Sequence, residues 1–450
     1  MLAAAASPAA ARDTLVHDQQ EYVAAAKALA PGDRIILANG EWRDFAVRFS
    51  GQGNEAKPIT LTAETPGKVI LTGASSLRMS GAWLVVSNLV FKDGHGTGED
   101  LIAFRFDTKR WAENSRLTGI VVDGYGAPTA AKTDHWVSLY GRGNRVDHSH
   151  FTGKVHGGAM LVVVRAAYLP LDNHHRIDHN YFGPRPPLGE NGGETIRIGT
   201  SQESQSDSFT VVEDNFFERC DGEVEIVSIK SGKNILRRNV VVESQGAFVM
   251  RHGYGNAIED NVFFGNGVKR TGGIRVINKH QLVRNNYLEG VTGDGPYSAI
   301  TLMNGVPNSP LNRYVQVEDV LIERNSVIDA ATVTLGNGAD QELSLAPIST
   351  RFVGNLFVNA KRGDPFVAKA DIAGIIFTGN VMSVTGPAAL PIAMDRRTVT
   401  LKRAANGLLY PTDPALAKRG ADRTLKPISR EETGVSWYAK PAASPLPGSN

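Results

Sequence analysis

The sequence has little of several features that would point to common classes of protein. It contains one cysteine, Cys220, in 450 residues, so no disulfide can form within the chain and no CxxC metal or redox motif exists. Its 48 Lys and Arg residues nearly balance 46 Asp and Glu, and the net charge of +2 argues against a general nucleic-acid-binding surface. No stretch approaches the ~18 uninterrupted apolar residues of a transmembrane helix. We therefore expect neither a nucleic-acid partner nor a membrane span.

The N-terminal region predicts an export signal followed by a short helix. The first residues read MLAAAASPAAARD, and this AxA-like run resembles the end of a secretory signal without its charged start. We expect residues 1–12 to be a residual export signal or flexible tail, and the protein to be periplasmic or secreted in a bacterium. The amphipathic segment HDQQEYVAAAKAL predicts a helix from about His17 to Leu29, stopped by Pro31 and Gly32. We therefore expect residues 13–31 to form an N-terminal capping helix.

A short motif recurs along most of the chain, with an Asn followed by two mostly apolar residues. Successive asparagines are separated by 35, 24, 22, 25, 39, 30 and 25 residues, which indicates one repeating coil that carries loops of variable length. Ser149 and Asn88 are expected to hold the same place in earlier coils. The repeated residues are Asn180, Asn215, Asn239, Asn261, Asn286, Asn325, Asn355 and Asn380.

The repeat predicts an all-β fold, a single-domain right-handed parallel β-helix over residues 32–400. Short runs of Val, Ile, Phe and Tyr between Gly, Asn and Asp are typical of many short strands, and the regular Leu spacing of a leucine-rich repeat is missing. Asparagine at one corner tolerates left-handed backbone geometry and can stack its amide into a ladder. Generic turns also use Asn, but eight recurrences in the same apolar frame favour the ladder. Residues 401–450 lose the repeat and are expected to pack on the β-helix as an irregular segment.

Four basic residues recur near the coil spacing. Residues one coil apart in a parallel β-helix lie about 4.8 Å apart, so groups with a common function can be sought at that spacing. Arg197, Lys230, Arg251 and Arg275 are separated by 33, 21 and 24 residues, and their local sequences are otherwise apolar. Like charges stacked this closely repel one another, and an anionic ligand would compensate them. The alternative is that they are scattered, solvated surface charges.

An acidic pair lies beside these basic residues. Glu223 and Glu225 alternate with Val224 in the stretch CDGEVEIVSIK, which predicts that both carboxylates face one side of a strand. Asn191 lies 32 residues before Glu223, about one coil back. One amide and two carboxylates form an all-oxygen set suited to Ca²⁺, whereas zinc prefers His or Cys.

These residues together resemble polysaccharide lyase family six, which contains alginate lyases and chondroitinase B. The resemblance rests on Asn191-Gly-Gly, Glu223-Val-Glu225, Lys230 and Arg251-His252, and on stretches such as GDRIILANGEW (32–42) and PITLTAETPGKVILTG (58–73). It implies a parallel β-helix and calcium-dependent β-elimination. The implied roles are base for Lys230, acid for Arg251, sugar-carboxylate contacts for Arg197, His252 and Arg275, and calcium ligands for Asn191, Glu223 and Glu225.

The resemblance favours an alginate lyase, a monomer whose partner is an anionic polysaccharide. A dermatan sulfate (chondroitin B) lyase is the alternative within the family. Outside it, a glycoside hydrolase would use Glu223 and Glu225 as its carboxylate pair, and a non-catalytic β-helical polysaccharide-binding protein would use the basic residues without turnover. Lys230 among arginines favours the lyase. Discrimination between substrates is expected in inserted loops such as 100–135 and 290–315.

Overall fold

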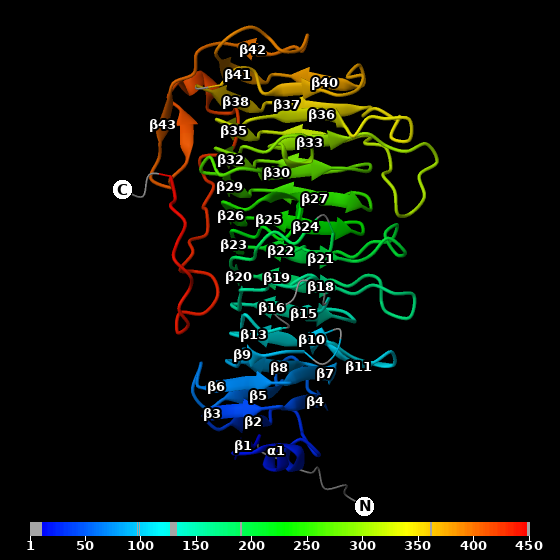
Figure 1. The fold of residues 1–450 in the computed structure, drawn as a ribbon, viewed down its shortest axis with the longest axis vertical. Helices are drawn as coiled ribbons and strands as arrows, with labels where there is room; N and C mark the ends of the chain where they lie inside the picture. The colour runs from blue at the N-terminus through cyan, green and yellow to red at the C-terminus, as the bar shows by residue number, and fades with distance from the viewer. Residues whose placement is uncertain are drawn as a thin grey trace, which may run out of the picture.

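The chain forms a parallel β-helix. A computed structural model describes residues 11–96, 98, 100–126, 133–189, 191–360 and 362–447, so most of the expected export signal lies outside the described residues. Three long sheets run the length of the molecule, and successive strands of one sheet come from successive coils. Figure 1 shows the strands stacked as rungs from α1 at one end to β42 at the other. The predicted all-β parallel β-helix is confirmed.

Sheet C carries the residues that matter most for function. Its strands pair in parallel except for the antiparallel contact between β11 and β12. In spatial order the strands are β11 (Arg105–Asp107), β12 (Arg110–Glu113), β7 (Ser76–Ala82), β10 (Asp100–Ala103), β15 (His135–Leu139), β18 (Leu161–Val163), β21 (Ile196–Ile198), β24 (Glu225–Lys230), β27 (Gly246–His252), β30 (Thr271–Val276), β33 (Ile300–Met303), β36 (Val333–Asn337) and β39 (Phe366–Ala368), with β4 (Ala46–Gln52) beside β7.

Sheets A and B form the other two faces, with fourteen strands each. Sheet A runs from β1 (Asp13–Val16) and β2 (Arg34–Leu37) to β40 (Ile375–Thr378). Sheet B runs from β3 (Gly40–Arg43) to β41 (Val381–Val384) and β42 (Asp395–Arg396). Each full coil therefore supplies one strand to every sheet, and its side chains alternate between the enclosed core and the outside.

The asparagine ladder forms at the corner between sheets A and B. From Asn180 to Asn380 each Asn donates its side-chain N–H to the side-chain oxygen of the next, over 2.9–3.0 Å. The left-handed residue is not the asparagine itself but the one before it, as in His179 with φ 55° and Asp214 with φ 53°. Asparagine stays in the ladder because its amide there bonds both to its neighbour and to a backbone carbonyl.

This geometry corrects the placement of Asn88. Asn88 has φ 65° and follows Ser87, the last residue of β8 (Leu84–Ser87), so it occupies the left-handed position and Leu89 follows in the ladder position. Ser149 does hold the ladder place, and its backbone N–H donates to Asn180 Oδ1 at 3.0 Å. Asn is favoured both in the ladder position and in the left-handed position before it. A motif defined only by residue type can therefore be placed one residue too early.

Both ends of the chain cover parts of the β-helix. The N-terminal helix α1 (Gln19–Ala25) is shorter than the predicted His17–Leu29, and residues 13–16 pair with β2 as the first strand of sheet A. After the helix, the Asp33 carboxylate accepts hydrogen bonds from the Ala30 N–H and from Arg12, which ties the loop that follows α1 to the start of β1. No helix among the described residues is long and apolar enough to cross a membrane.

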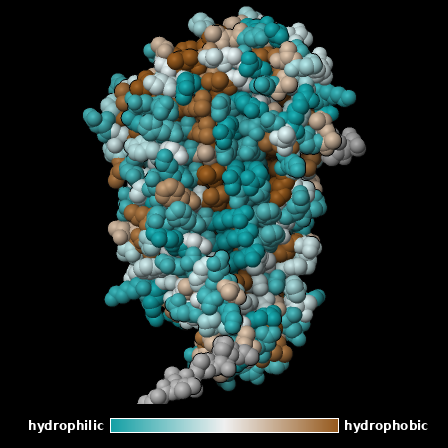
Figure 2. All heavy atoms as spheres, turned by 180° about the vertical axis from the view of Figure 1, so that it is seen from behind, coloured by the Kyte–Doolittle hydropathy of each residue, from teal (hydrophilic) through white to brown (hydrophobic). Residues whose placement is uncertain are grey.

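The C-terminal segment runs beside sheet B, from β43 (Leu401–Arg403) and β44 (Leu409–Pro411) onward (Figure 1). Leu408, Tyr410 and Leu425 pack in one buried cluster with sheet B residues that include Tyr181 and Tyr287. The surface on the far side from Figure 1 is mostly hydrophilic, with apolar residues in scattered groups (Figure 2). The main apolar core therefore lies inside the coil stack, and the C-terminal segment covers apolar side chains on the outside of sheet B.

Candidate active site

The four basic residues lie together on sheet C but not in one column. Strand pairing places Arg197 opposite Ser228, Ser228 opposite Val249, and Val249 opposite Arg275. Lys230 pairs with His252, and the register shifts between Ile229 and Lys230 because β27 carries one extra residue there. Arg251 is that extra residue. A bulge of this kind changes the direction of a side chain. Here it places Arg251 beside the row of paired residues that runs from Arg197 to Arg275. The sequence spacing had predicted a single row for all four basic residues.

Glu225 lies among three basic groups. It is the first residue of β24, and its carboxylate accepts hydrogen bonds from the Ser228 hydroxyl and the Arg275 guanidinium. Arg251 Nε lies 3.7 Å from the same carboxylate. Burial disfavours the charge of Glu225, but the positive charges of Arg275 and Lys230 outweigh burial and lower its pKa. Glu225 is therefore an anion that fixes the two arginines.

Glu223 does not share the strand with Glu225. It lies in the bend before β24, so the predicted alternation along one strand is wrong, although both residues are buried. Burial raises the pKa of Glu223 to about 9, and the negative charges of Glu194 and Glu225 add to that effect. Burial and the charges of two neighbouring carboxylates therefore disfavour the anionic form of Glu223, and a bound cation would stabilise that form.

Glu194 was not predicted from the sequence. It precedes β21, is 3% exposed, and its Oε1 lies 3.8 Å both from Lys230 Nζ and from Arg197 Nη1. Its position three residues before Arg197 was the only available signal. Tyr314 and His135 were also missed. Tyr314 lies in the loop after β33, where no coil spacing applies, and His135 is the first residue of β15, the strand that follows the long insertion. The Arg251 guanidinium carbon lies 4.0 Å from the Tyr314 ring centre, and Arg197 Nη2 lies 3.3 Å from His135 Nε2.

Several buried polar atoms in this region have no hydrogen-bond partner among the described residues. Buried polar groups in proteins are nearly always paired, so a cluster of unpaired ones marks a place for a ligand. The His252 ring also lies here, with Nε2 3.4 Å from Ser201 Oγ, and burial beside Arg251 and Lys230 lowers its pKa to about 3, so the ring is neutral near pH 7. The unpaired atoms are Glu194 Oε2, Arg197 Nε, Arg251 Nη1, His252 Nδ1 and Arg275 Nε.

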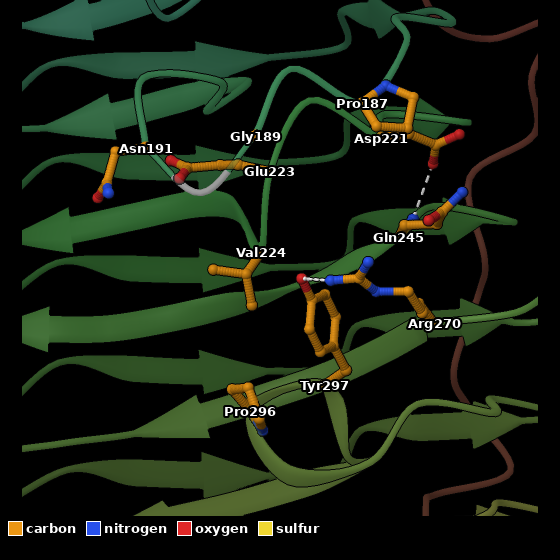
Figure 3. Close-up of a pocket in the computed structure, with 10 residues that line it drawn as sticks. All are labelled: Pro187, Gly189, Asn191, Asp221, Glu223, Val224, Gln245, Arg270, Pro296 and Tyr297. Carbon is orange, nitrogen blue, oxygen red and sulfur yellow. Dashed lines mark hydrogen bonds between the residues drawn. The ribbon is translucent and has the colours of Figure 1, made fainter. Parts of the chain in front are cut away.

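Asn191 and Glu223 line one cavity of about 460 Å³ (Figure 3). The two loops that carry these residues lie very close together. A Cβ atom added at Gly193 would come within 2.3 Å of the Gly222 carbonyl oxygen, so only glycine fits there. In Figure 3 the Glu223 carboxylate turns toward the side where Asn191 lies, and Arg270 donates a hydrogen bond to the Tyr297 hydroxyl on the opposite side.

The residues present fit a calcium ion. No group of three or more His, Cys, Asp or Glu side chains in the described part of the chain is arranged as a ready metal centre. The predicted set is different, since it combines the Asn191 amide with the Glu223 and Glu225 carboxylates. All its donors are oxygens, as calcium prefers, and burial together with the charges of Glu194 and Glu225 raises the pKa of Glu223, so a nearby cation would favour its charged form.

Comparison with known proteins gives the family. The family model described as Chondroitinase B matches residues 16–416. The solved structure of the alginate lyase AlyGC is 51% identical, covers 96% of this chain and superposes with a TM-score of 0.94. The chain belongs to polysaccharide lyase family 6. This chain spans 59% of the length of AlyGC.

Other family 6 structures are also similar. A mannuronic acid-specific family 6 lyase from human gut microbiota is 34% identical, with 86% of this chain and 91% of that chain covered and a TM-score of 0.77. The alginate lyase AlyF-OU02, solved in complex with G6, is 23% identical over 94% of this chain and 95% of that chain, with a TM-score of 0.77, and shares the fold. No curated protein matches.

Proposed function

We propose that this protein is an alginate lyase that cleaves the polysaccharide by calcium-dependent β-elimination. The observation that carries the proposal is a lysine and three arginines gathered around unpaired buried atoms, in a chain 51% identical to an enzyme described as an alginate lyase. A uronate carboxylate supplies the acceptor that the unpaired arginine N–H groups lack. The mannuronic acid specificity stated for a second relative supports the same substrate class.

Lys230 is the residue placed to accept the proton from carbon 5 of the uronate. It stands at the end of β24, and Glu194 lies 3.8 Å from its amine. Lys230 acts in its neutral form, and the proton then resides on Nζ. A positioned base of this kind contributes roughly 10²–10⁴-fold to a rate.

Arg251 is placed to stabilise charge on the departing oxygen. Its guanidinium stacks on Tyr314, its Nε lies near Glu225, and its Nη1 has no partner among the described residues. Burial lowers its pKa, which assists proton sharing, but an arginine remains a poor proton donor. We therefore assign it charge stabilisation or assisted donation to the leaving oxygen, while Arg197, His252 and Arg275 bind the sugar carboxylates.

Asn191, Glu223 and Glu225 would hold the calcium ion. When bound, calcium would supply a Lewis acid that neutralises the uronate carboxylate beside the acidic carbon 5 proton. The protein's own contribution is to keep the oxygen donors in place, with Arg275 and Ser228 fixing Glu225.

A dermatan sulfate lyase is the second candidate, because the matching family model is described as Chondroitinase B. The glycoside hydrolase is less favoured, since Glu225 is held by Arg275 and Ser228 and is not free to act on a sugar. We also infer that the protein acts outside the cytoplasm as a monomer; the AxA-like N-terminal run and the polymeric substrate support export.

The test is an assay on alginate and on dermatan sulfate with calcium and with a chelator. Ultraviolet absorbance of unsaturated uronate and new reducing ends are followed together. Absorbance that rises on alginate and falls with chelator supports the proposal. A rise on dermatan sulfate alone changes the substrate, reducing ends without absorbance indicate hydrolysis, and no product from either polymer contradicts a lyase acting on these substrates.

A further inference from the structure

A second basic hollow lies on sheet C toward the N-terminal coils. Between β10 and β12 the chain leaves the sheet and returns through β11 as an antiparallel hairpin, which projects sideways in Figure 1. Arg78, Arg105 and Phe106 line a hollow of about 320 Å³ at the base of this hairpin. This hairpin belongs to the inserted loop 100–135, in which substrate discrimination was expected.

Four arginines and two aspartates surround the hollow: Arg78, Arg105, Asp100 and Asp107 line it, and Arg48 and Arg110 stack on Phe106 beside it. Arg48 stacks on the Phe106 ring with its guanidinium carbon 4.0 Å from the ring centre, and it has no ion pair among the described residues. Arg78 donates to the backbone carbonyls of Asp100 and Leu101, so its charge is not neutralised by a carboxylate at ion-pair distance in the described part of the chain. Like charges held around one hollow repel unless an anion enters it.

The arginines are held in place by a fixed anchor. The Asp100 carboxylate accepts hydrogen bonds from Ser138 at 2.6 Å and Tyr140 at 3.2 Å, and it is 6% exposed. Arg105 lies 3.9 Å from Asp100 and stacks on Tyr140 at 4.1 Å. A guanidinium fixed in this way loses little freedom when it binds a carboxylate, and aromatic rings beside it offer a surface to a sugar ring.

A continuous polar path joins this hollow to the candidate active site. His135 Nδ1 lies 3.3 Å from Asp100, and its Nε2 lies 3.3 Å from Arg197 Nη2. Arg197 and Lys230 in turn flank Glu194. From β10 to β24 the path crosses four strand spacings, about 19 Å in all, which is longer than one sugar ring. A chain lying along the axis of the β-helix would place one sugar at Lys230 and another at the hollow.

We propose that the hollow lined by Arg78, Arg105 and Phe106, with Arg48 stacked on Phe106 at its edge, is a distal subsite. It binds the carboxylate of a uronate several sugars away from the bond that is cleaved. This inference rests on the proposed function, because it takes the substrate to be a polyuronate. It makes long polyuronates better substrates than short oligomers, because only a long chain reaches both sites.

The test compares short and long substrates in matched variants. Arg48→Gln, Arg105→Gln and the double variant are assayed on alginate trimers and octamers. The matched control is Arg142→Gln, an exposed arginine that does not line the hollow and is paired with Asp172. We expect the double variant to raise the KM for octamers about tenfold, to leave kcat/KM for trimers unchanged, and to lose this difference in high salt.

An equal loss on trimers and octamers, or no loss on either, would overturn the subsite. Binding of octamers to Lys230→Ala, with and without the double variant, separates this inference from the proposed function. If the wild-type protein makes no unsaturated product but the double variant still weakens octamer binding about tenfold, the function fails and the subsite stands. If the double variant binds octamers as tightly as its parent, the subsite is wrong even in an active lyase.

Discussion

Two buried polar networks in this molecule differ in how completely their groups are paired. At the corner between sheets A and B, each ladder asparagine donates to its neighbour's amide oxygen, and interior members such as Asn215, Asn239 and Asn261 also donate to backbone carbonyls. On sheet C, buried atoms of Glu194, Arg251 and other residues remain unpaired among the described residues.

The difference separates stability from function. A fully paired network holds neighbouring coils in register, and removing a member leaves buried groups without partners. An incompletely paired network costs folding energy until a ligand completes it. Substitutions in the ladder should therefore change unfolding, whereas substitutions on sheet C should change turnover or ligand binding.

The largest expected effect comes from Lys230→Ala. We expect kcat on alginate to fall about 10³-fold, because the base for the carbon 5 proton is lost. The melting temperature should change little, since the replaced side chain is only half-buried. The matched control is Lys233→Ala, three residues later and exposed, which should keep full activity. Normal turnover by Lys230→Ala would refute its assignment as the base.

Asn261→Ala is the reciprocal change in the ladder. It removes the acceptor for Asn239 and the donor to Asn286 and to two backbone carbonyls. We expect the free energy of unfolding to fall by about 3 kcal/mol, measured by denaturant titration, with kcat/KM of the folded protein within twofold of wild type. Asn54→Ala is the control, because Asn54 is exposed and its side-chain oxygen accepts one hydrogen bond, from the Lys57 N–H. A large loss of activity without loss of stability would contradict the assignment of the ladder to stability rather than to function.

Calcium should stabilise the folded protein through Glu223. After treatment with a chelator, added calcium at about 100 times its dissociation constant should raise the free energy of unfolding by about 2.7 kcal/mol. Calorimetry should show most of this gain lost in Glu223→Gln and kept in Glu323→Gln, a partly exposed residue of sheet A. Equal stabilisation of both variants would place the ion elsewhere.

The smallest effect is expected at the far side of the cavity in Figure 3. Arg270 is exposed and held by Tyr297, so Arg270→Gln should raise the KM for alginate only about threefold and leave kcat unchanged. Lys269→Gln, its exposed neighbour, is the control. A larger effect on kcat than on KM would give Arg270 a part in the chemistry.

The sequence predicted the fold and the neighbourhood of the site better than its local geometry. Coil spacing identified the asparagine ladder, because each member makes the same bonds in every coil. It misplaced Asn88 by one residue, since both the ladder and the left-handed position before it accept Asn. The coil spacing placed Arg251 in the same row as the other three basic residues. A one-residue bulge cannot be recognised from the spacing, because loop lengths also vary between coils. Glu194 and Tyr314 were missed because neither is repeated.

A second corner ladder was missed for a related reason. Between sheets C and A, the backbone N–H of Asn234 donates to Asn256, and that of Asn256 donates to Gln281. Earlier coils use Thr210 and His175 in this row, so the residue type varies while the hydrogen bond is kept. A pattern search for one residue type cannot find a row that several types satisfy.

The most direct test of the central claim is a crystal structure of Lys230→Ala with calcium and an alginate tetrasaccharide. The account predicts sugar carboxylates against Arg197, His252 and Arg275, calcium among Asn191, Glu223 and Glu225, and carbon 5 of one uronate facing the place of the missing amine. An oligosaccharide bound elsewhere, with the buried atoms of sheet C still unpaired, would contradict it.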